Sequence, residues 1–319
     1  MSEAAISGSG LQSNLLDDYT SDCELQGLTP ESIRRYLSSL GIFLDFINRK
    51  ELDIFQVEKE ALKDFIRYLR KDREVSYVTI KYYFSALSSF YSYLRYEDLI
   101  DHDPIHQVRK RYLRSYKRVG PTIHKQLISV EQMSQFVRFI MKPRDKALVL
   151  LLAKTGIRRA EAIGIDLEDI NFIEQSINLK HHPKRTNTLV FFDAETNDTI
   201  QNWLISRERI TGLPPDEGPL FVNSTGARLR RNGVYTAVTR WAKIFGIHDP
   251  KSRDSRDRFN PHSCRHWFTT HLRRAGMCRE FRAWLRGDRL REAQDAYDHI
   301  DPEEVRLDYL QKIPYLGLY

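Results

Sequence analysis

The sequence predicts a mainly α-helical protein with a small antiparallel β element, divided into two domains. Apolar residues recur at helical spacing over long stretches, first within residues 29–96 and again in the second half of the chain. Residues 171–193 differ, because β-branched and aromatic residues stand on both sides of a polar turn. A basic segment without acidic residues separates the two helical parts, so we expect a domain boundary there.

The first domain is predicted to be a helical bundle over residues 23–108. Thr29 suits an N-cap and Pro30 the first helical position, so a helix should begin there. Two more apolar stripes follow, the second of them over residues 77–96. Residues 1–22 are polar and contain glycine, and we expect them to form a flexible N-terminal tail.

The composition favours a polyanionic partner. The 319 residues include 50 lysines and arginines against 43 aspartates and glutamates, which gives a formal net charge of +7. Residues 109–126 hold a concentration of basic side chains and a Gly120-Pro121 break, and they are predicted to form a basic interdomain linker. Such a run is either a solvated surface or a contact for phosphate groups.

The cysteines and the apolar runs indicate a cytoplasmic protein. Only three cysteines occur, Cys23, Cys264 and Cys278, which suits a reducing compartment better than a disulfide framework. The longest apolar run, residues 147–153, is too short to span a membrane, and the N-terminus lacks the pattern of an export signal. We therefore expect no membrane association.

The second domain is predicted over residues 127–319. An apolar helix over residues 145–154 should end at Gly156, where the backbone turns. Residues 171–193 predict two strands joined by a turn. Further helices are expected at three places: residues 195–210, 232–245 and 261–275.

The helix over residues 261–275 carries a polar cluster that a packing helix would not need. His262, Arg265 and His266 share one face of it, and its apolar residues lie largely elsewhere. The spacing of His262 and His266 matches a zinc-binding helix, but Ser263 stands where the metalloprotease glutamate should be. We therefore expect no metal and no other cofactor.

Three short motifs mark the second half of the chain. They read Thr155-Gly-Ile-Arg158-Arg-Ala-Glu161, His262-Ser-Cys-Arg265-His266 and Tyr297-Asp-His299. In type, order and spacing they resemble the motifs of the tyrosine recombinases, the family of phage integrases and Xer-type recombinases. The resemblance implies a two-domain architecture, in which a helical core-binding (SAM-like) DNA-binding domain precedes an α+β catalytic domain.

The resemblance also implies a site-specific DNA recombinase, or integrase, that cleaves and rejoins strands through a covalent 3′-phosphotyrosyl intermediate. Such an enzyme would serve the integration, excision or resolution of a mobile element. Arg158 and Arg265 would stabilise the charge on the phosphate, and the alignment selects Arg158 over its neighbour Arg159. Tyr297 would be the nucleophile, and His262 would exchange protons and orient the phosphate.

The family also places a catalytic lysine near the tip of a β-hairpin. Lys184 lies in the predicted turn and Lys180 on the incoming strand. We choose Lys184 as the general acid, because a turn can swing its lysine toward the scissile phosphate. A solvated turn lysine without a catalytic role is the alternative.

One position departs from the family's pattern. The family usually has a Gly-His pair before the tyrosine, whereas this chain has Arg286-Gly287-Asp288. An ionised carboxylate cannot donate to a phosphate oxygen and would repel it, so Asp288 is left out of the catalytic set. Either Asp288 turns outward and orients Arg286, or the function of the site is altered.

The partners implied by the resemblance are double-stranded DNA and further copies of this chain, which would assemble into a tetramer on DNA. Accessory DNA-bending proteins are compatible with that assembly. The apolar stripe of Val305, Tyr309 and Ile313 either packs on its own domain or docks in a neighbouring subunit. The second possibility leads us to expect that a chain ending at Asp301 stays folded and binds a single DNA half-site, but loses cooperative occupancy of paired half-sites. The alternative function is that of a non-catalytic DNA-binding protein that has retained the fold.

Overall fold

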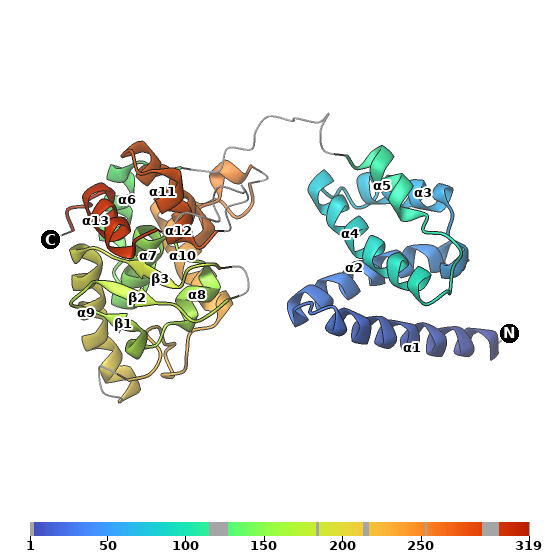
Figure 1. Cartoon of the computed structure of the whole chain (residues 1–319), viewed down its shortest axis with the longest axis horizontal. Coiled ribbons are helices and arrows are strands. Elements are labelled where there is room, and N and C mark those ends of the chain that lie inside the picture. The colour runs from blue at the N-terminus through green and yellow to red at the C-terminus, as the bar shows by residue number, and fades with distance from the viewer. Residues whose placement is uncertain are drawn as a thin grey trace. The chain divides into compact units, whose positions relative to one another are not determined.

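The computed structural model describes most of the chain, and the chain divides into two compact units, Met1–Pro121 and Thr122–Tyr319. The described residues are 3–114, 127–182, 185–212, 217–252, 254–288 and 300–318, with the backbone alone for residues 3–13 and 255. The predicted fold class is confirmed, because helices dominate both units and the second contains a small three-stranded antiparallel sheet (Figure 1).

The N-terminal unit is a bundle of helices around an aromatic-rich core. The helix predicted from Thr29 begins at that cap, since the Thr29 side chain accepts from the Ser32 N–H group. Ser76 caps the helix over residues 77–96 in the same way by accepting from the Thr79 N–H group. The helices are α1 Glu3–Leu25, α2 Pro30–Arg49, α3 Lys59–Lys71, α4 Tyr77–Tyr96 and α5 Ile105–Tyr112, with a 3₁₀ turn at Ile54–Gln56.

The predicted flexible tail over residues 1–22 is wrong from Glu3 onward, where α1 begins. Tyr19 and Cys23 are fully buried, and the Tyr19 ring lies edge-on to Phe90 of α4 at 5.2 Å between centroids. These side chains anchor α1 to the bundle through tertiary packing, which outweighs the low helix propensity of its serines and glycines.

The predicted basic linker over residues 109–126 begins inside a helix, because α5 extends to Tyr112. Ile105, Val108 and Leu113 are buried in the core of the N-terminal unit. These three side chains pack one side of the segment against the bundle, and the basic residues of the segment lie on its other side. Residues 115–126 of the predicted linker lie outside the described residues.

The C-terminal unit packs its helices around α7, whose apolar run over residues 147–153 is fully buried. Helix α7 contacts both α9 and α11. The helices are α6 Val130–Phe139, α7 Pro143–Thr155, α8 Arg159–Gly164, α9 Ala194–Thr211, α10 Arg231–Phe245, α11 Pro261–Arg274, α12 Arg279–Arg286 and α13 Pro302–Lys312, with 3₁₀ turns at Leu167–Asp169 and Ser255–Asp257.

The sheet has one strand more than the predicted hairpin. Strand β2 (Ser176–Asn178) lies between β1 (Ile170–Asn171) and β3 (Leu189–Phe191), and all neighbours are antiparallel. Ile177 is paired with Ile170 on one side and with Val190 on the other. The connection from β2 to β3 contains the predicted turn.

The C-terminal segment packs on its own unit, which is the first of the two possibilities predicted for its apolar stripe. Helix α13 buries Val305 and Tyr309 against α11 and α12, and Ile313, which caps the helix, is buried there as well. The Tyr309 hydroxyl donates to the backbone oxygen of Lys154 at 2.9 Å. The amphipathic stripe is therefore part of a core within the unit.

A buried charge network holds the last residues in place. Lys154, at the end of α7, is fully buried and forms an ion pair with Glu195 at 2.8 Å and another with Asp193. The Glu195 carboxylate also accepts from the N–H groups of Leu316 at 2.8 Å and Leu318 at 2.9 Å. Burial acts to raise the pKa of Glu195, but Lys154 and these N–H groups outweigh it and hold the pKa below its ordinary value.

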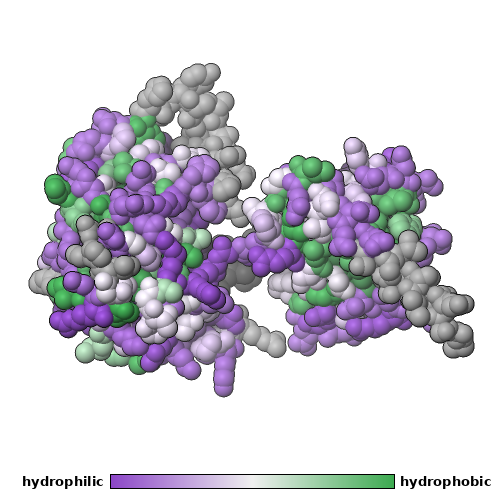
Figure 2. Space-filling view, turned by 90° about the horizontal axis from the view of Figure 1, so that it is seen from below, coloured by the Kyte–Doolittle hydropathy of each residue, from purple (hydrophilic) through white to green (hydrophobic). Residues whose placement is uncertain are grey.

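The surface is largely polar. On the face drawn in Figure 2, hydrophilic residues predominate and hydrophobic ones form small separate spots. Within the described ranges, no helix is both long and apolar enough to cross a membrane.

Candidate active site

A glycine turn at the end of α7 brings the two predicted catalytic arginines together. Gly156 caps α7 in the left-handed region with φ +62°. A Cβ there would lie 2.4 Å from Cδ1 of Phe268 on α11, so only glycine allows the two helices to approach this closely. Arg158 follows two residues later, and Arg265 lies one turn before Phe268 on α11.

Arg265 is held almost completely inside the protein. Its Nη1 donates to the Gly156 oxygen at 2.6 Å and its Nη2 to the Arg286 oxygen at 2.9 Å. Only 4% of the residue is exposed. Burial, reinforced by Arg158 and Arg286, lowers the pKa of Arg265 to about 10, so the guanidinium is charged at neutral pH.

His262 lies on the same helix as Arg265, one turn nearer its start. Asn260 caps this helix by accepting from the His262 N–H at 2.9 Å, and Pro261 occupies the first helical position, as predicted. A cavity of about 330 Å³ is lined by both predicted arginines and by His262. The remaining lining residues are Ile157, Arg159, Tyr235, Asn260 and Pro261.

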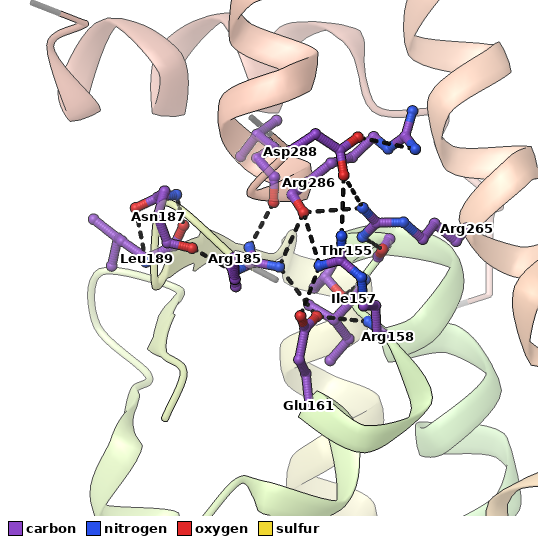
Figure 3. Close-up of polar contacts among 12 residues, drawn as sticks. Thr155, Ile157, Arg158, Glu161, Arg185, Asn187, Leu189, Arg265, Arg286 and Asp288 are labelled. Carbon is purple, nitrogen blue, oxygen red and sulfur yellow. Dashed lines mark hydrogen bonds and ion pairs between the residues drawn. The ribbon is translucent and has the colours of Figure 1, made fainter. Parts of the chain in front are cut away.

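The C-terminal end of α12 gathers the guanidiniums of three arginines (Figure 3). The Arg286 oxygen accepts from Arg158 at 3.4 Å and from Arg185 at 3.3 Å, in addition to Arg265. The Leu285 oxygen accepts from Arg185 at 2.7 Å. The free carbonyls and the negative end of the helix dipole attract cations, so this short helix orients the arginines.

Glu161 is the shared counterion of Arg158 and Arg185. Its carboxylate accepts from Arg158 Nη1 at 2.9 Å, from the Arg158 backbone N–H at 2.7 Å and from Arg185 Nη1 at 3.0 Å. Burial alone would raise the pKa of Glu161, but the arginines and the N–H group outweigh it and hold the pKa below its ordinary value. Glu161 therefore holds both arginines in place.

Asp288 points inward rather than outward. Its Oδ1 lies 3.0 Å from Arg158 Nη2 and 2.9 Å from Arg265 Nη2, while Oδ2 lies 3.0 Å from Arg286 Nη2. The interpretation that Asp288 turns outward is therefore wrong, although the contact with Arg286 that it included is present. Four guanidiniums and two carboxylates meet here, which leaves two positive charges in excess.

The structure brings three of the five predicted site residues to one place. Arg158, His262 and Arg265 line a single cavity. Lys184 and Tyr297 lie outside the described residues.

Lys180, the other candidate lysine, is held by an acidic cluster. It lies 2.8 Å from Asp169, 3.4 Å from Glu168 and 3.6 Å from Asp166. The hydrogen bond to Asp169 raises the pKa of Lys180, with further support from Glu168 and Asp166. The Lys180 amino group is thus engaged with carboxylates, although half of its side chain is exposed.

Arg185 is the residue at this site that the sequence did not reveal. Its side chain is fully buried, and it joins the β2–β3 connection to Glu161 and to the end of α12. Burial lowers the pKa of Arg185, which Glu161 and Asp288 partly offset. Gly287 was the one signal in the sequence for this contact. A glycine after an amphipathic run marks the end of a helix, and the free carbonyls at that end need hydrogen-bond donors such as Arg185.

Comparisons with known proteins agree with this architecture. The model of the phage integrase family matches residues 126–309, and the model of its N-terminal SAM-like domain matches residues 15–101. Tyrosine recombinase XerC of Thermodesulfovibrio yellowstonii is 27% identical over 284 residues, 86% of this chain and 88% of that protein. XerC of Psychromonas ingrahamii is 26% identical over 94% of this chain and 96% of its own length.

A solved structure of the Tn1549 transposon integrase with transposon right end DNA has a similar fold. Its TM-score is 0.66 at 16% identity, covering 92% of this chain and 98% of that one. The family match extends over more than half of the chain and includes the cavity described above. The chain therefore belongs to the phage integrase family and is a tyrosine recombinase, an enzyme of site-specific DNA recombination.

Proposed function

We propose that this recombinase cleaves and rejoins double-stranded DNA with Arg158, Lys184, His262, Arg265 and Tyr297 as its catalytic residues. The observation that carries the proposal is the convergence of Arg158, His262 and Arg265 on one cavity. The Nη2 atoms of both arginines lie within 3.0 Å of a single carboxylate oxygen, so they are spaced to hold one anionic oxygen together.

The two arginines suit the chemistry of a phosphodiester. Negative charge grows on the non-bridging oxygens as the transition state forms, and fixed guanidiniums stabilise it without reorganising. Arg265 is held by backbone oxygens, and Arg158 is held by Glu161. Both are therefore oriented before a substrate arrives.

Tyr297 is the proposed nucleophile. Its hydroxyl oxygen attacks the phosphorus, a 3′-phosphotyrosyl bond forms, and the bond to the 5′ oxygen breaks. Attack by a 5′ hydroxyl later reverses the exchange, so no external energy source is needed. Tyr297 stands nine residues after Asp288, a stretch that spans at most about 30 Å when extended, so the chain length places no obstacle to this role.

Lys184 is the proposed general acid for the leaving 5′ oxygen, with His262 as the residue that exchanges protons and orients the phosphate. The neighbours of Lys184 support this role. Arg185, which follows it in the sequence, is anchored to Glu161 at 3.0 Å and to the end of α12. Lys180, in contrast, is engaged with three acidic residues.

DNA is the proposed partner of both units. The N-terminal unit has a cavity of about 690 Å³ between α2 and α4, lined mostly by serine, tyrosine and arginine side chains that include Arg34 and Tyr82, with Arg35 paired to Glu31 at its edge. Such groups contact phosphates and bases. The net charge of +7 supports the same partner.

We further propose that four copies assemble on DNA in the cytoplasm, to integrate, excise or resolve a mobile element. Cys23, Cys264 and Cys278 are all free, which supports a reducing compartment. A second candidate function, DNA binding without catalysis, would retain the basic surfaces. The preorganised arginines favour catalysis, because binding alone does not need two of them on one oxygen.

Covalent capture distinguishes these functions. DNA that the protein captures covalently is sequenced to find its site, and a duplex of that sequence is nicked next to the cleavage position so that religation fails. The wild-type chain should then accumulate a protein–DNA band, whereas Tyr297→Phe should give none and retain DNA affinity within about threefold. The control is Tyr315→Phe, which alters an exposed tyrosine and should leave the band unchanged.

Absence of the band with the wild-type chain would favour the binding function. A band that persists in Tyr297→Phe would refute the assignment of the nucleophile. Tyr309 would be a poor replacement, because it is fully buried and burial raises its pKa far above the ordinary value.

A further inference from the structure

The Asp288 carboxylate occupies the point at which Arg158 and Arg265 converge. Its Oδ1 accepts from Nη2 of both arginines, and its Oδ2 faces Arg286 (Figure 3). The side chain is 31% exposed, so solvent reaches it. A partly exposed anion thus holds the donors that the proposed chemistry assigns to the phosphate.

The arginines do not depend on Asp288 for their positions. Arg158 is held by Glu161, and Arg265 is held by the backbone oxygens of Gly156 and Arg286. Their contacts with Asp288 add a charge to an arrangement that other contacts already define.

The place of Asp288 is set by the backbone. Gly287 caps α12 in the left-handed region with φ +60°, and the Asp288 N–H donates to the Ala283 oxygen at 3.0 Å. The carboxylate therefore projects from a defined helix end, with Arg286 beside it as a partner that the proposed phosphate contacts do not use.

We propose that Asp288 is an internal competitor of the scissile phosphate. It holds Arg158 and Arg265 while the site is empty, and an entering phosphate takes over their Nη2 donors. Asp288 then keeps its contact with Arg286 alone. The inference rests on the proposed function, since it requires that these two arginines bind the phosphate. Its consequence is that Asp288 weakens anion binding at the site and disfavours binding of any anion that lacks the other DNA contacts.

Inorganic sulfate tests the competition without DNA. We expect the full-length wild-type chain to show no saturable sulfate binding below about 10 mM by titration calorimetry. Asp288→Asn should bind sulfate about tenfold to a hundredfold more tightly, because no carboxylate then competes for the Nη2 donors of Arg158 and Arg265. Asp288→Ser should behave like Asp288→Asn. Asp288→Glu keeps the charge and should resemble the wild type. Adding Arg158→Gln to Asp288→Asn should abolish the gain.

Asp308→Asn is the matched control, because Asp308 has the same charge and pairs with Lys312 on α13. It should leave sulfate binding unchanged, which separates a local effect from the change in net charge. Equal sulfate affinity in the wild type and Asp288→Asn would overturn the proposal. So would failure of both Asp288→Asn and Asp288→Ser to fold, because the carboxylate would then be a structural counterion.

DNA experiments separate this inference from the proposed function. On the captured sequence, Asp288→Asn should bind the DNA more tightly than Asp308→Asn does and should still form the covalent band. A sulfate gain without a covalent band in any variant would support competition at an anion site and refute catalysis. A band in the wild type with no sulfate gain would support catalysis and refute the competition.

Discussion

At the scale of single residues, the two candidate lysines differ most clearly in their surroundings. Lys180 is bound to Asp166, Glu168 and Asp169, so its proton is held firmly. We expect Lys184→Ala to slow cleavage by about a hundredfold or more, as loss of a general acid does, and Lys180→Ala to leave the rate nearly unchanged. The measurement is the single-turnover cleavage rate on the captured site.

A modified substrate tests the chemical role of the lysine. A 5′-bridging phosphorothiolate has a sulfur leaving group that needs no protonation, so it should restore the rate of Lys184→Ala. Restoration of Lys180→Ala instead would transfer the role to the strand lysine. If the sulfur rescues neither variant, neither lysine is the general acid.

Glu161 provides a second prediction, about stability and pH. Its side chain is 2% exposed and pairs with two arginines, so Glu161→Gln should lower the free energy of unfolding by about 3 kcal/mol at pH 7. The folded-state pKa lies below the unfolded value of about 4.3. The contribution is therefore complete above the unfolded pKa and is lost as the pH falls through the folded pKa.

Denaturant unfolding of both proteins between pH 7 and pH 3.5 measures this difference. The gap should be widest at neutral pH and should narrow below about pH 4.3. Glu303→Gln is the control, since Glu303 is exposed and its pair with Arg306 should contribute less than about 1 kcal/mol. A gap that widens as the pH falls would contradict the assignment of Glu161 as a stabilising carboxylate.

The sequence predicts best those site residues whose side-chain type the proposed reaction requires. Arg158, His262 and Arg265 could be predicted because local motifs name them, and the structure brings them to one cavity. The partner of Arg185 and the inward direction of Asp288 could not be predicted. Arg185 contacts Glu161 of α8, and Asp288 contacts Arg265 of α11; these contacts join residues that are distant in the sequence and leave no periodic pattern.

At the scale of elements, the end of α12 is the support on which the arginines meet. A Cβ at Gly287 would lie 2.2 Å from Cγ of Arg185, and the backbone has φ +60°. Gly287→Ala should therefore cost about 1 kcal/mol from the backbone conformation and more from displacement of Arg185. Because Arg185 shares Glu161 with Arg158, the cleavage rate should fall as well.

The chain offers a matched control at Gly276. It has φ +85°, but a Cβ there would meet no atom within 4 Å. Gly276→Ala has the backbone cost without the collision, so the difference between the two variants isolates the Arg185 contact. Thermal unfolding and cleavage rates measure it. Equal losses in both variants would show that the approach of Arg185 to Gly287 is unimportant.

Element length decides how well the sequence predicts the fold. The long helices α2 and α4 follow from caps and apolar periodicity, and both begin at the predicted residues. Helices α8 and α12 are too short for a periodic pattern to emerge, and strand β1 has two residues. Such elements are stabilised by their neighbours more than by their own sequence.

At the scale of the whole molecule, the C-terminal segment completes the core of its unit. Removal of the residues after Asp301 exposes the surface that Val305, Tyr309 and Ile313 cover, and it leaves Glu195 without the N–H groups of Leu316 and Leu318. Each buried side chain contributes about 1.5–3 kcal/mol, so the loss is comparable with the roughly 5–15 kcal/mol that stabilises a whole domain.

We therefore expect a chain ending at Asp301 to be insoluble or to lack a cooperative unfolding transition. A chain ending at Ile313 is the matched control, because it keeps α13 and the buried pair of Lys154 with Glu195. It should fold, with a free energy of unfolding lower by about 2–4 kcal/mol from the lost Leu316 side chain and from the two N–H groups, of Leu316 and Leu318, that Glu195 no longer accepts from. Circular dichroism and thermal unfolding distinguish the two. The opposite outcome is a soluble chain ending at Asp301 that binds one DNA half-site normally and loses only cooperative binding to paired half-sites. That result would show that the segment's main role is to link subunits. Packing within the unit would then contribute little to its stability.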